Sequence, residues 1–308
     1  MHSARENPPR IILSFDVEEH YRIEAAAGVS CEQPRRARYA QRMEEVTRWL
    51  VDTLSERGIF ATFFIVGEIA RDRPALVKAI HRAGHEVGSH SWDHRRIHVH
   101  TPESFREDVR TSKDVLEQVT GAAIVGYRAP TFSLVTQTAW ALDELAESGM
   151  RYDSSIYPVR HDRYGIPRAP RAPFMAVGER QQLLEIPPMT LQVFGTKIAV
   201  GGGGYFRLFP LAVMEKAIRQ TGRMCRPAVA MLYFHPWEFD PDQERLPLSR
   251  LSSFRTYVGI RRSRRRLITL LGRYQFCRAV DVAADLEQCS ADLPFYPLRM
   301  PTVSVSAN

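Results

Sequence analysis

The sequence lacks the features that mark several common classes of protein. Its four cysteines, Cys31, Cys225, Cys277 and Cys289, form no C-x-x-C pair, so neither a zinc ribbon nor a disulfide framework is expected. No apolar run approaches the roughly 18 residues of a membrane-spanning helix. The polar segment 1–10 has no apolar stretch like that of a secretory signal, which favours a cytoplasmic location.

The chain does have enough apolar sequence for a sizeable core. Hydrophobic residues make up 44% of its 308 residues and charged residues 25%, as in one large α/β domain or two ordinary domains. The formal net charge of +7 is unevenly placed, because segment 250–278 holds nine arginines and no acidic residue. The rest of the chain is therefore nearly neutral, and the excess positive charge belongs to one C-terminal segment.

Strand-like and helix-like patterns alternate along most of the chain. Strands are expected, among other places, at 10–17, 59–66, 85–89 and 227–234. Helices are expected, among other places, at 38–57, 74–83, 101–119 and 210–220. This alternation favours a parallel sheet or a barrel. The four glycines at 201–204 are expected to form a flexible turn, and 250–273 a single helix.

The first expected strand ends in Asp16, Val17, Glu18 and Glu19. Because strand side chains alternate, Asp16 and Glu18 point to the same face. Two carboxylates on one face repel each other unless a cation lies between them or one takes up a proton. Taken alone, a solvated strand end explains the pair equally well.

The expected strand at 85–89 is followed by His90 and His94. If the chain turns helically there, the two imidazoles lie one turn apart, at the spacing with which two histidines grip a metal ion. Such pairs also arise by chance on protein surfaces. The acidic pair at another strand end makes metal binding the better interpretation.

Two further strands end in an arginine and a histidine, Arg128 and His235. An arginine at such a position can pair with a carboxylate and keep it ionised. In a parallel barrel the carboxyl ends of the strands converge on one face, where active sites are built. The residues at these strand ends are therefore expected to meet.

Together these motifs resemble the polysaccharide deacetylase family, the NodB-homology domain of carbohydrate esterase family 4, over roughly residues 11–237. Segments 203–207 and 253–255 resemble the subgroup linked to exosortase-type exopolysaccharide loci. The resemblance implies an α/β fold, a distorted (β/α) barrel of seven or eight strands in a single domain. The implied parts are a catalytic barrel at 10–240, a basic helical extension packed on the barrel at 241–290 and an irregular tail at 291–308.

The resemblance also implies a mononuclear metal site. His90 and His94 match the family's two metal-binding histidines. The family's usual Asp-Asp is replaced here by Asp-Val-Glu-Glu, so Glu18 is the expected third ligand and Glu19 stays an alternative. The implied cofactor is one divalent ion, commonly Zn²⁺, with Co²⁺, Mn²⁺ or Ni²⁺ as alternatives.

Asp16 matches the general base of the family, Arg128 its ion-pair partner and His235 the general acid. Further residues match with departures from the family pattern. An oxyanion donor is expected at the backbone N–H of Thr131, sugar contacts at Tyr205 and Trp237, and an acid that tunes His235 at Asp153.

The implied reaction is metal-assisted hydrolysis of N-acetyl groups on an amino-sugar polysaccharide or its lipid-linked precursor. Two alternatives stay open: hydrolysis of another C–N bond, in a cyclic imide or a formamido sugar, and a non-catalytic glycan-binding protein.

The arginine-rich segment has two interpretations. Its apolar residues, from Leu251 to Leu271, can cap the barrel and leave the charges solvated. Alternatively, its basic cluster contacts anionic lipid headgroups at the inner membrane face or a lipid-pyrophosphate-linked glycan. No nucleic-acid-binding motif accompanies the charge, so nucleic acid is not an expected partner. The cluster consists of Arg261, Arg262, Arg264, Arg265 and Arg266.

Overall fold

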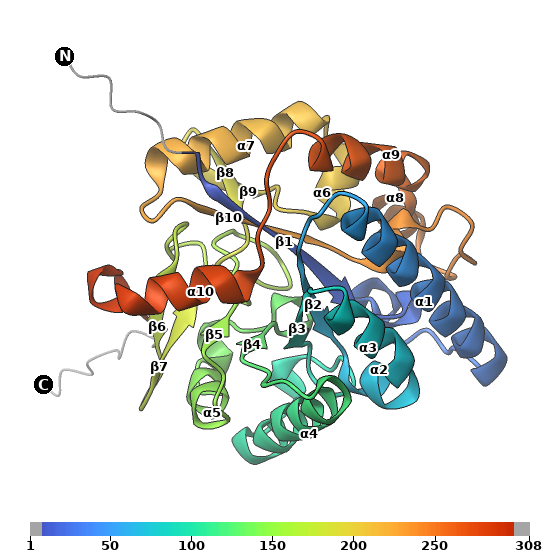
Figure 1. The fold of residues 1–308 in the computed structure, drawn as a ribbon, viewed down its shortest axis with the longest axis horizontal. Coiled ribbons are helices and arrows are strands. Elements are labelled where there is room, and N and C mark those ends of the chain that lie inside the picture. The colour runs from blue at the N-terminus through green and yellow to red at the C-terminus, as the bar shows by residue number, and fades with distance from the viewer. Residues whose placement is uncertain (1–7, 299–308) are drawn as a thin grey trace, which may run out of the picture.

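A mostly parallel sheet organises residues 8–298, the part of the chain that the computed structural model describes (Figure 1). Its strands are β1 (Arg10–Val17), β2 (Thr62–Ile65), β3 (Glu86–Ser89), β4 (Gly126–Tyr127), β5 (Tyr152–Asp153), β6 (Phe174–Val177), β7 (Gln182–Glu185), β10 (Val229–Phe234) and β11 (Phe295–Pro297). They lie in the order β10-β1-β2-β3-β4-β5-β7-β6-β11, and only β6 and β7 pair antiparallel. The expected α/β class with a mostly parallel sheet is confirmed.

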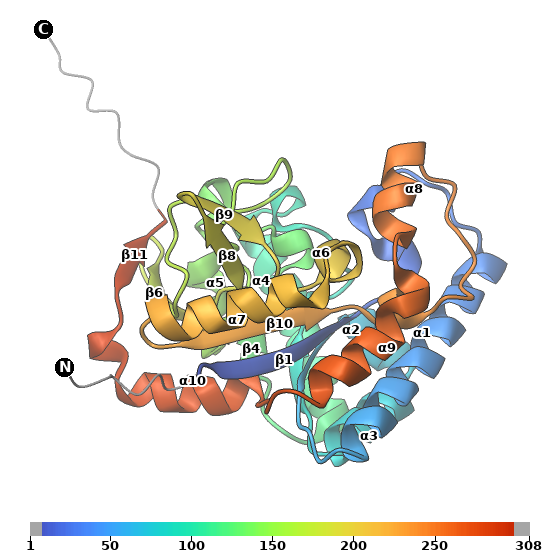
Figure 2. The same cartoon turned by 90° about the horizontal axis from the view of Figure 1, so that it is seen from above.

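Helices surround this sheet, as Figures 1 and 2 show from two sides. The α-helices are α1 (Gln33–Ser55), α2 (Gly67–Asp72), α3 (Pro74–Arg82), α4 (Pro102–Thr120), α5 (Ala141–Glu147), α6 (Gly203–Leu208), α7 (Leu211–Met224), α8 (Arg250–Tyr257), α9 (Ile260–Leu271) and α10 (Ala279–Gln288). A separate antiparallel hairpin is formed by β8 (Thr190–Val193) and β9 (Thr196–Ala199). No helix of the described chain is both long enough and apolar enough to cross a membrane.

β1 lies in the interior of the molecule between β10 and β2. Every residue of this strand after Arg10 is buried, because both faces of the sheet are covered. This is why its sequence is a nearly continuous apolar run rather than an alternation of apolar and polar residues. Its pairing with β10 joins residues more than 200 positions apart, with Phe15 opposite Phe234.

The sheet approaches a barrel without pairing its two terminal strands, β10 and β11, in the described chain. Two isolated parallel bridges, Pro188–Met231 and Gly202–Tyr233, attach the segments around residues 188 and 202 to β10. A Cβ at Gly202 would lie 1.6 Å from the Tyr233 carbonyl oxygen, so this close approach requires glycine. The expected flexible turn at 201–204 is therefore wrong: the segment is largely buried, and α6 begins within it.

The C-terminal part differs from its expected form in two places. The single helix expected at 250–273 is two helices, because Gly259 adopts a left-handed conformation (φ 74°) between α8 and α9. Leu251 and Phe254 are 59% and 58% exposed and do not cap the fold, whereas Leu271 is buried. The tail expected to be irregular contains β11, which pairs with β6; its last part, 299–308, lies outside the described residues.

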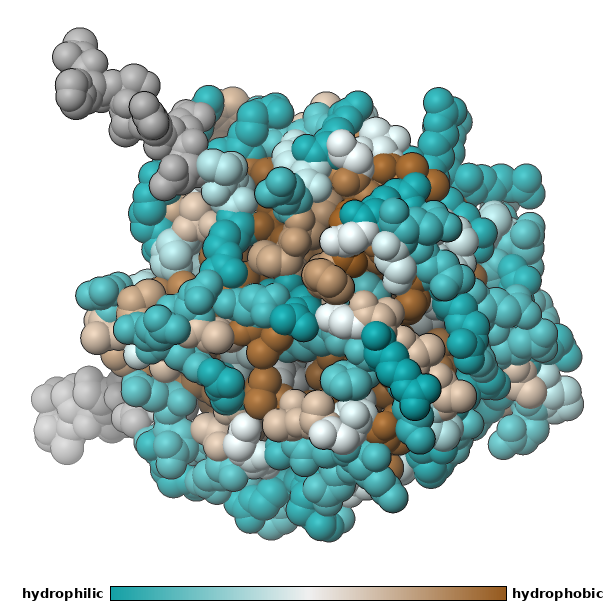
Figure 3. Space-filling view, viewed as in Figure 1, coloured by the Kyte–Doolittle hydropathy of each residue, from teal (hydrophilic) through white to brown (hydrophobic). Residues whose placement is uncertain are grey.

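Polar residues cover most of the face shown in Figure 3, and hydrophobic residues appear in gaps between them. In the view of Figure 2, α8 and α9 lie at one end of the sheet beside α1. The arginine-rich segment thus lies next to the carboxyl end of β1, where Asp16 and Glu18 are located.

Candidate active site

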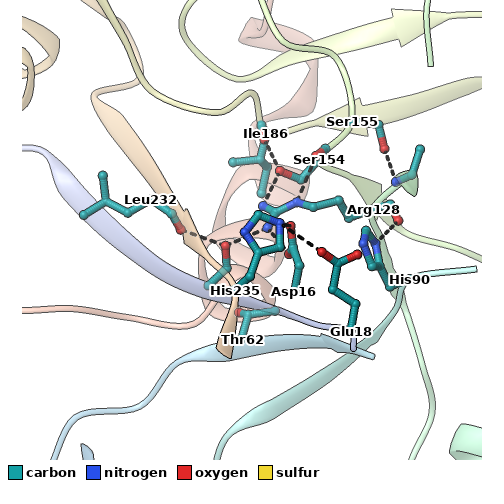
Figure 4. A network of polar contacts seen from close by, with 12 residues as sticks. Asp16, Glu18, Thr62, His90, Arg128, Ser154, Ser155, Ile186, Leu232 and His235 are labelled. Atoms are coloured by element: carbon teal, nitrogen blue, oxygen red, sulfur yellow. Dashed lines mark hydrogen bonds and ion pairs between the residues drawn. The ribbon is translucent and has the colours of Figure 1, made fainter. Parts of the chain in front are cut away.

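A pocket of about 260 Å³ opens where β1, β3, β4 and β10 end. The ends of β1, β3 and β10 send polar side chains into the same space: Asp16, Glu18, His90, His94 and His235 line it. Figure 4 shows the side chains of Asp16, Glu18 and His235 turned toward one another, with Arg128 behind them. The parallel arrangement explains the convergence, because all carboxyl ends of such strands meet at one edge.

Glu18, His90 and His94 form a group of three potential metal ligands whose donor atoms lie within 4.8 Å of one another. The Glu18 carboxylate contacts His94 Nε2 directly. Its neighbour Glu19 turns away and forms an ion pair with Arg22 at 2.6 Å. The group therefore takes Glu18, not Glu19, from the acidic run at the end of β1.

The two histidines meet through a turn that is not helical. Ser91 and His94 have left-handed backbone conformations, with φ of 68° and 67°. This tight turn brings the two imidazole centroids to 5.0 Å. The helical turn assumed for the His90–His94 spacing is wrong, although the two side chains do end on the same side.

The chemistry of the three side chains fits a divalent cation. His90 Nδ1 is hydrogen-bonded to the Arg128 carbonyl oxygen at 2.7 Å, which leaves Nε2 to face the group. Burial lowers the pKa of His90 to about 4, so the imidazole is neutral at ordinary pH. Glu18 Oε2 is buried, and within the described chain its polar contact is the one with His94 Nε2. Burial by itself would raise the pKa of Glu18, but the neighbouring histidines, His94 above all, lower it.

Asp16 lies beside this group as one half of a buried ion pair. Arg128 Nη1 donates to Asp16 Oδ1 at 2.6 Å and to the Ser14 hydroxyl at 2.8 Å. The other guanidinium nitrogens bond to Ser154, and the guanidinium carbon lies 4.2 Å from the centroid of the Phe64 ring. Arg128 is completely buried, so its position is determined on every side. Asp16 thus faces the pocket with a permanent positive charge behind it.

His235 faces Asp16 and Glu18 from the opposite wall. Its Nε2 lies 3.8 Å from Asp16 Oδ2 and 3.8 Å from Glu18 Oε1. Its Nδ1 is hydrogen-bonded to Glu238 Oε1 at 2.6 Å. Burial alone would lower the pKa of His235, but the bond to Glu238 and the charges of nearby carboxylates raise it to about 9. The imidazole is therefore protonated at neutral pH, and a cation held by Glu18 would offset part of this shift.

Glu238 is in turn held by Arg207, whose Nε donates to Glu238 Oε2 at 3.0 Å. Arg207 also donates to the carbonyl oxygens of Arg255, Thr256 and Val258, at the end of α8. His235, Glu238 and Arg207 therefore form a chain of buried contacts from the pocket to the C-terminal helices. Sequence reasoning missed the last two residues, although the spacing of His235 and Glu238 places a carboxylate one turn beyond the histidine.

Two of the residues expected to contact the substrate, Thr131 and Trp237, line the pocket. Thr131 does so with a left-handed backbone (φ 56°) in the loop after β4. Trp237 packs its ring on His235, with the centroids 5.3 Å apart, and donates its indole N–H to Glu18 Oε1 at 3.1 Å. Trp237 therefore orients the acidic member of the potential metal group.

Two other assignments do not fit the geometry. Asp153 accepts a hydrogen bond from the Ser155 hydroxyl and lies against Glu185, where burial raises the pKa of both carboxyls. It supports the loop after β4, because Ser155 accepts from the Ala129 N–H; the residue that contacts His235 is Glu238. Tyr205 stacks on Phe209 and is not among the residues that line the pocket.

Comparison with known families divides the chain into two matches. Residues 6–152 match the family model described as polysaccharide deacetylase, and residues 154–284 match a domain of unknown function, DUF3473. The pocket draws on both: Asp16 and Arg128 belong to the first match, and His235 and Glu238 to the second. The second segment also supplies β10, the neighbour of β1, so it completes the sheet and the pocket.

The curated relatives match over short stretches. A peptidoglycan-N-acetylglucosamine deacetylase of Listeria monocytogenes is 38% identical over 95 residues, 30% of this chain and 20% of that protein. A chitooligosaccharide deacetylase of Azorhizobium caulinodans is 29% identical over 93 residues, 30% of this chain and 44% of that protein. The chain thus spans less than half the length of these relatives.

Two solved structures share the fold over nearly all of the chain. A Mycobacterium smegmatis protein assigned to the polysaccharide deacetylases superposes with a TM-score of 0.63 and 19% identity, covering 98% of both chains. The allantoinase PuuE superposes with a TM-score of 0.59 and 18% identity, covering 93% of both chains. At these identities the similarity concerns the fold alone.

Proposed function

We propose that this chain, whose residues 6–152 are a polysaccharide deacetylase domain, is a metal-dependent hydrolase that removes N-acetyl groups from an amino-sugar glycan. One observation carries the proposal: a three-donor group that fits a divalent cation lies beside a buried carboxylate, Asp16, and an imidazole, His235, whose Nε2 is 3.8 Å from both Asp16 and Glu18. The names of the relatives, which specify peptidoglycan N-acetylglucosamine and chitooligosaccharide, support an N-acetylated glycan as the substrate.

In this proposal Glu18, His90 and His94 hold the metal ion. Zinc fits two imidazoles and one carboxylate, and Co²⁺, Mn²⁺ or Ni²⁺ could occupy the same donors. A divalent cation bound there supplies Lewis acidity, which acidifies water and polarises an acyl oxygen.

The chain's own residues then move the protons. Asp16, which is paired with Arg128, accepts a proton from the water that attacks the acetyl carbon. The backbone N–H of Thr131 donates a hydrogen bond to the oxygen of that acyl group as negative charge develops on it. His235 donates its proton to the amide nitrogen as the C–N bond breaks, because an amine leaves poorly unless it is protonated. The products are acetate and a glycan amine.

A second candidate is hydrolysis of another C–N bond, such as that of a cyclic imide or a formamido sugar. The fold similarity to an allantoinase supports this candidate, because enzymes that hydrolyse other C–N bonds share the fold with deacetylases. The third possibility, a non-catalytic glycan-binding protein, requires that the purified chain bind glycans and release nothing.

The decisive experiment measures acetate release from N-acetylglucosamine oligosaccharides and from peptidoglycan by the zinc-loaded protein. Asp16→Asn is expected to lower the rate by about 10²–10⁴-fold while leaving bound zinc unchanged. His94→Ala is expected to lose both zinc and activity, and Asp52→Asn, on the exposed side of α1, neither. Normal rates in Asp16→Asn would contradict the assigned base. Release of products only from cyclic imides or formamido sugars would favour the second candidate.

We further propose that the protein binds peripherally at the inner membrane face, through fewer arginines than the sequence indicated. Of the five arginines of the basic cluster, Arg264 donates to the Phe239 carbonyl oxygen and Arg266 to that of Arg207, so both are engaged within the fold. Any contact with anionic lipid therefore depends on Arg261, Arg262 and Arg265, which are exposed. Cell fractionation of the wild-type chain and of a triple Arg→Gln variant tests this location, and equal membrane fractions would contradict it.

A further inference from the structure

A second pocket, which we call the arginine pocket, lies on the other side of Arg207 from the catalytic one. It encloses about 690 Å³ between the end of α6, the segment around Asp240 and the junction of α8 and α9. Its lining includes five arginines, Arg207, Arg245, Arg261, Arg262 and Arg266.

The charges of this pocket are not balanced. Among the described residues, Asp240 is the only acidic one in the lining, and it is already bound by the guanidinium of Arg42 through both carboxylate oxygens. Arg207 is committed to Glu238. Within residues 8–298, Arg245, Arg261 and Arg262 have no carboxylate partner. Three guanidinium groups thus border one cavity without an opposite charge.

Neighbouring groups add to the positive potential. The pKa of Arg266 is lowered by burial and by the charge of Arg262, which means that like charges lie close together here. Gly259 begins α9 without a side-chain cap, so the positive end of this 12-residue helix is also unneutralised. Acidic residues are favoured in the first turn of a helix, yet here it carries Arg261 and Arg262. A bound anion would lower the repulsion among these charges.

The pocket also contains an unsatisfied polar atom. Gln243 is 8% exposed, and its amide nitrogen donates to the carbonyl oxygens of Trp237 and Asp240. Its Oε1 is buried without a hydrogen-bond partner. Although Gln243 lines the arginine pocket, this oxygen is closed to solvent, so a ligand would be held by the arginines and not by Gln243.

We propose that the arginine pocket binds a phosphate group that belongs to a larger molecule. Guanidinium groups match the geometry of phosphate oxygens. The N-terminus of a helix adds backbone N–H groups, which also bind anions. The volume of about 690 Å³ is in the range of small-molecule sites and exceeds what a bare ion needs. This proposal does not depend on the proposed hydrolysis.

The arginine pocket adjoins the catalytic pocket. Arg207 lines both pockets, and residues 255–256 line the first while 257–262 line the second. A phosphate bound between Arg245 and Arg262 would therefore be separated from Glu238 by Arg207, which pairs with that carboxylate.

The test is calorimetric titration of the full-length chain with inorganic diphosphate. Arg261→Gln combined with Arg262→Gln is expected to weaken diphosphate binding at least about tenfold, because two phosphate contacts are removed. The matched control is Arg82→Gln combined with Arg219→Gln, which removes the same net charge from exposed sites outside the pocket. Circular dichroism checks that both variants are folded.

The two sources of phosphate are separated by a second arm with phosphatidylglycerol vesicles. Vesicle binding that diphosphate displaces identifies a lipid headgroup as the source, and diphosphate binding without vesicle binding identifies a soluble phosphate ligand; both support the site. Absence of diphosphate binding by the wild-type chain, or equal weakening in the control variant, would overturn the proposal.

Discussion

The two pockets on either side of Arg207 are built on opposite electrostatic principles. In the catalytic pocket, the buried charges of Asp16 and Glu238 each have an arginine within hydrogen-bond distance. In the arginine pocket, three guanidinium groups share one cavity, and none of them has a carboxylate partner among the described residues. Removing a charge should therefore destabilise the first pocket and relieve the second. The difference shows which groups the fold has completed by itself and which require a ligand.

The largest effect is expected for Arg128→Met. This change leaves Asp16 buried without its counter-ion, and losing one partner of a buried pair costs about 3–5 kcal/mol of unfolding free energy. Urea denaturation measures the loss. Arg110→Met, which removes an exposed pair with Glu107, serves as the control and should leave the midpoint nearly unchanged. Similar midpoints for the two variants would mean that the buried pair is not the source of rigidity in this pocket.

The second-largest effect is expected for Trp237→Phe, which changes the hydrogen bonding of Glu18. Trp237→Phe keeps the aromatic stacking on His235 but removes the indole donor to Glu18. Loss of such an outer hydrogen bond typically weakens metal binding by about 10–100-fold. Competition with a chelator measures the zinc affinity, with Trp49→Phe as a control that has no contact with the metal group. An unchanged affinity would show that Glu18 does not need this donor.

A smaller effect is expected for Glu238→Gln, because it preserves shape and hydrogen bonding but removes one negative charge. The raised pKa of His235 depends partly on this carboxylate, so the pKa should fall in the variant. His235 acts as an acid only while protonated, and activity is lost as pH rises through its pKa. The alkaline limb of the rate profile should therefore move to lower pH by at least about one unit.

That comparison is made between two zinc-loaded proteins, because a cation beside Glu18 also lowers the pKa of His235. The acidic limb, which reports the base, is the internal control and should stay in place. A purely structural role for Glu238 would lower the rate equally at every pH and leave the limb where it is.

The smallest effect has the opposite sign. Arg262→Gln removes a positive charge from the first turn of α9 and should raise the unfolding free energy by about 0.3–1 kcal/mol at low salt. The gain should vanish near 1 M salt, where such interactions are screened. Arg265→Gln, beyond the first turn and outside the pocket, should change stability less. A destabilised Arg262→Gln variant would mean that the arginine pocket is already compensated.

Local sequence patterns predicted much of the fold because the interior strands are buried on both faces. The limits of β1 match the apolar run at 10–17, and α4 begins after Thr101, whose hydroxyl accepts the Ser104 N–H. The patterns failed where the backbone leaves regular geometry. The left-handed conformations at Ser91, His94 and Gly259 depend on surrounding contacts, and single residues in the sequence did not reveal them.

For the candidate site, patterns at strand ends pointed to the residues that converge, but not to those that support them. The period of two along a strand placed Asp16 and Glu18 on one face, a consequence of covalent geometry alone. Glu238 was missed although it lies only three residues after His235, whereas Arg207 was missed because no local spacing encodes its contact with Glu238 across 31 residues.

The sequence by itself determined the order of strands and helices, the residue types at the strand ends and the excess of arginine in one segment, because these follow from local periodicity and composition. Tertiary structure confirmed the expected choice of Glu18 over Glu19 as the acidic partner of the two histidines, by turning Glu19 toward Arg22. It also decided that Glu238 rather than Asp153 holds His235, and that some arginines are neutralised while others are not. The physical reason is that electrostatic partners are chosen by distance in a folded, low-dielectric interior, where a few ångströms separate a satisfied charge from an unsatisfied one.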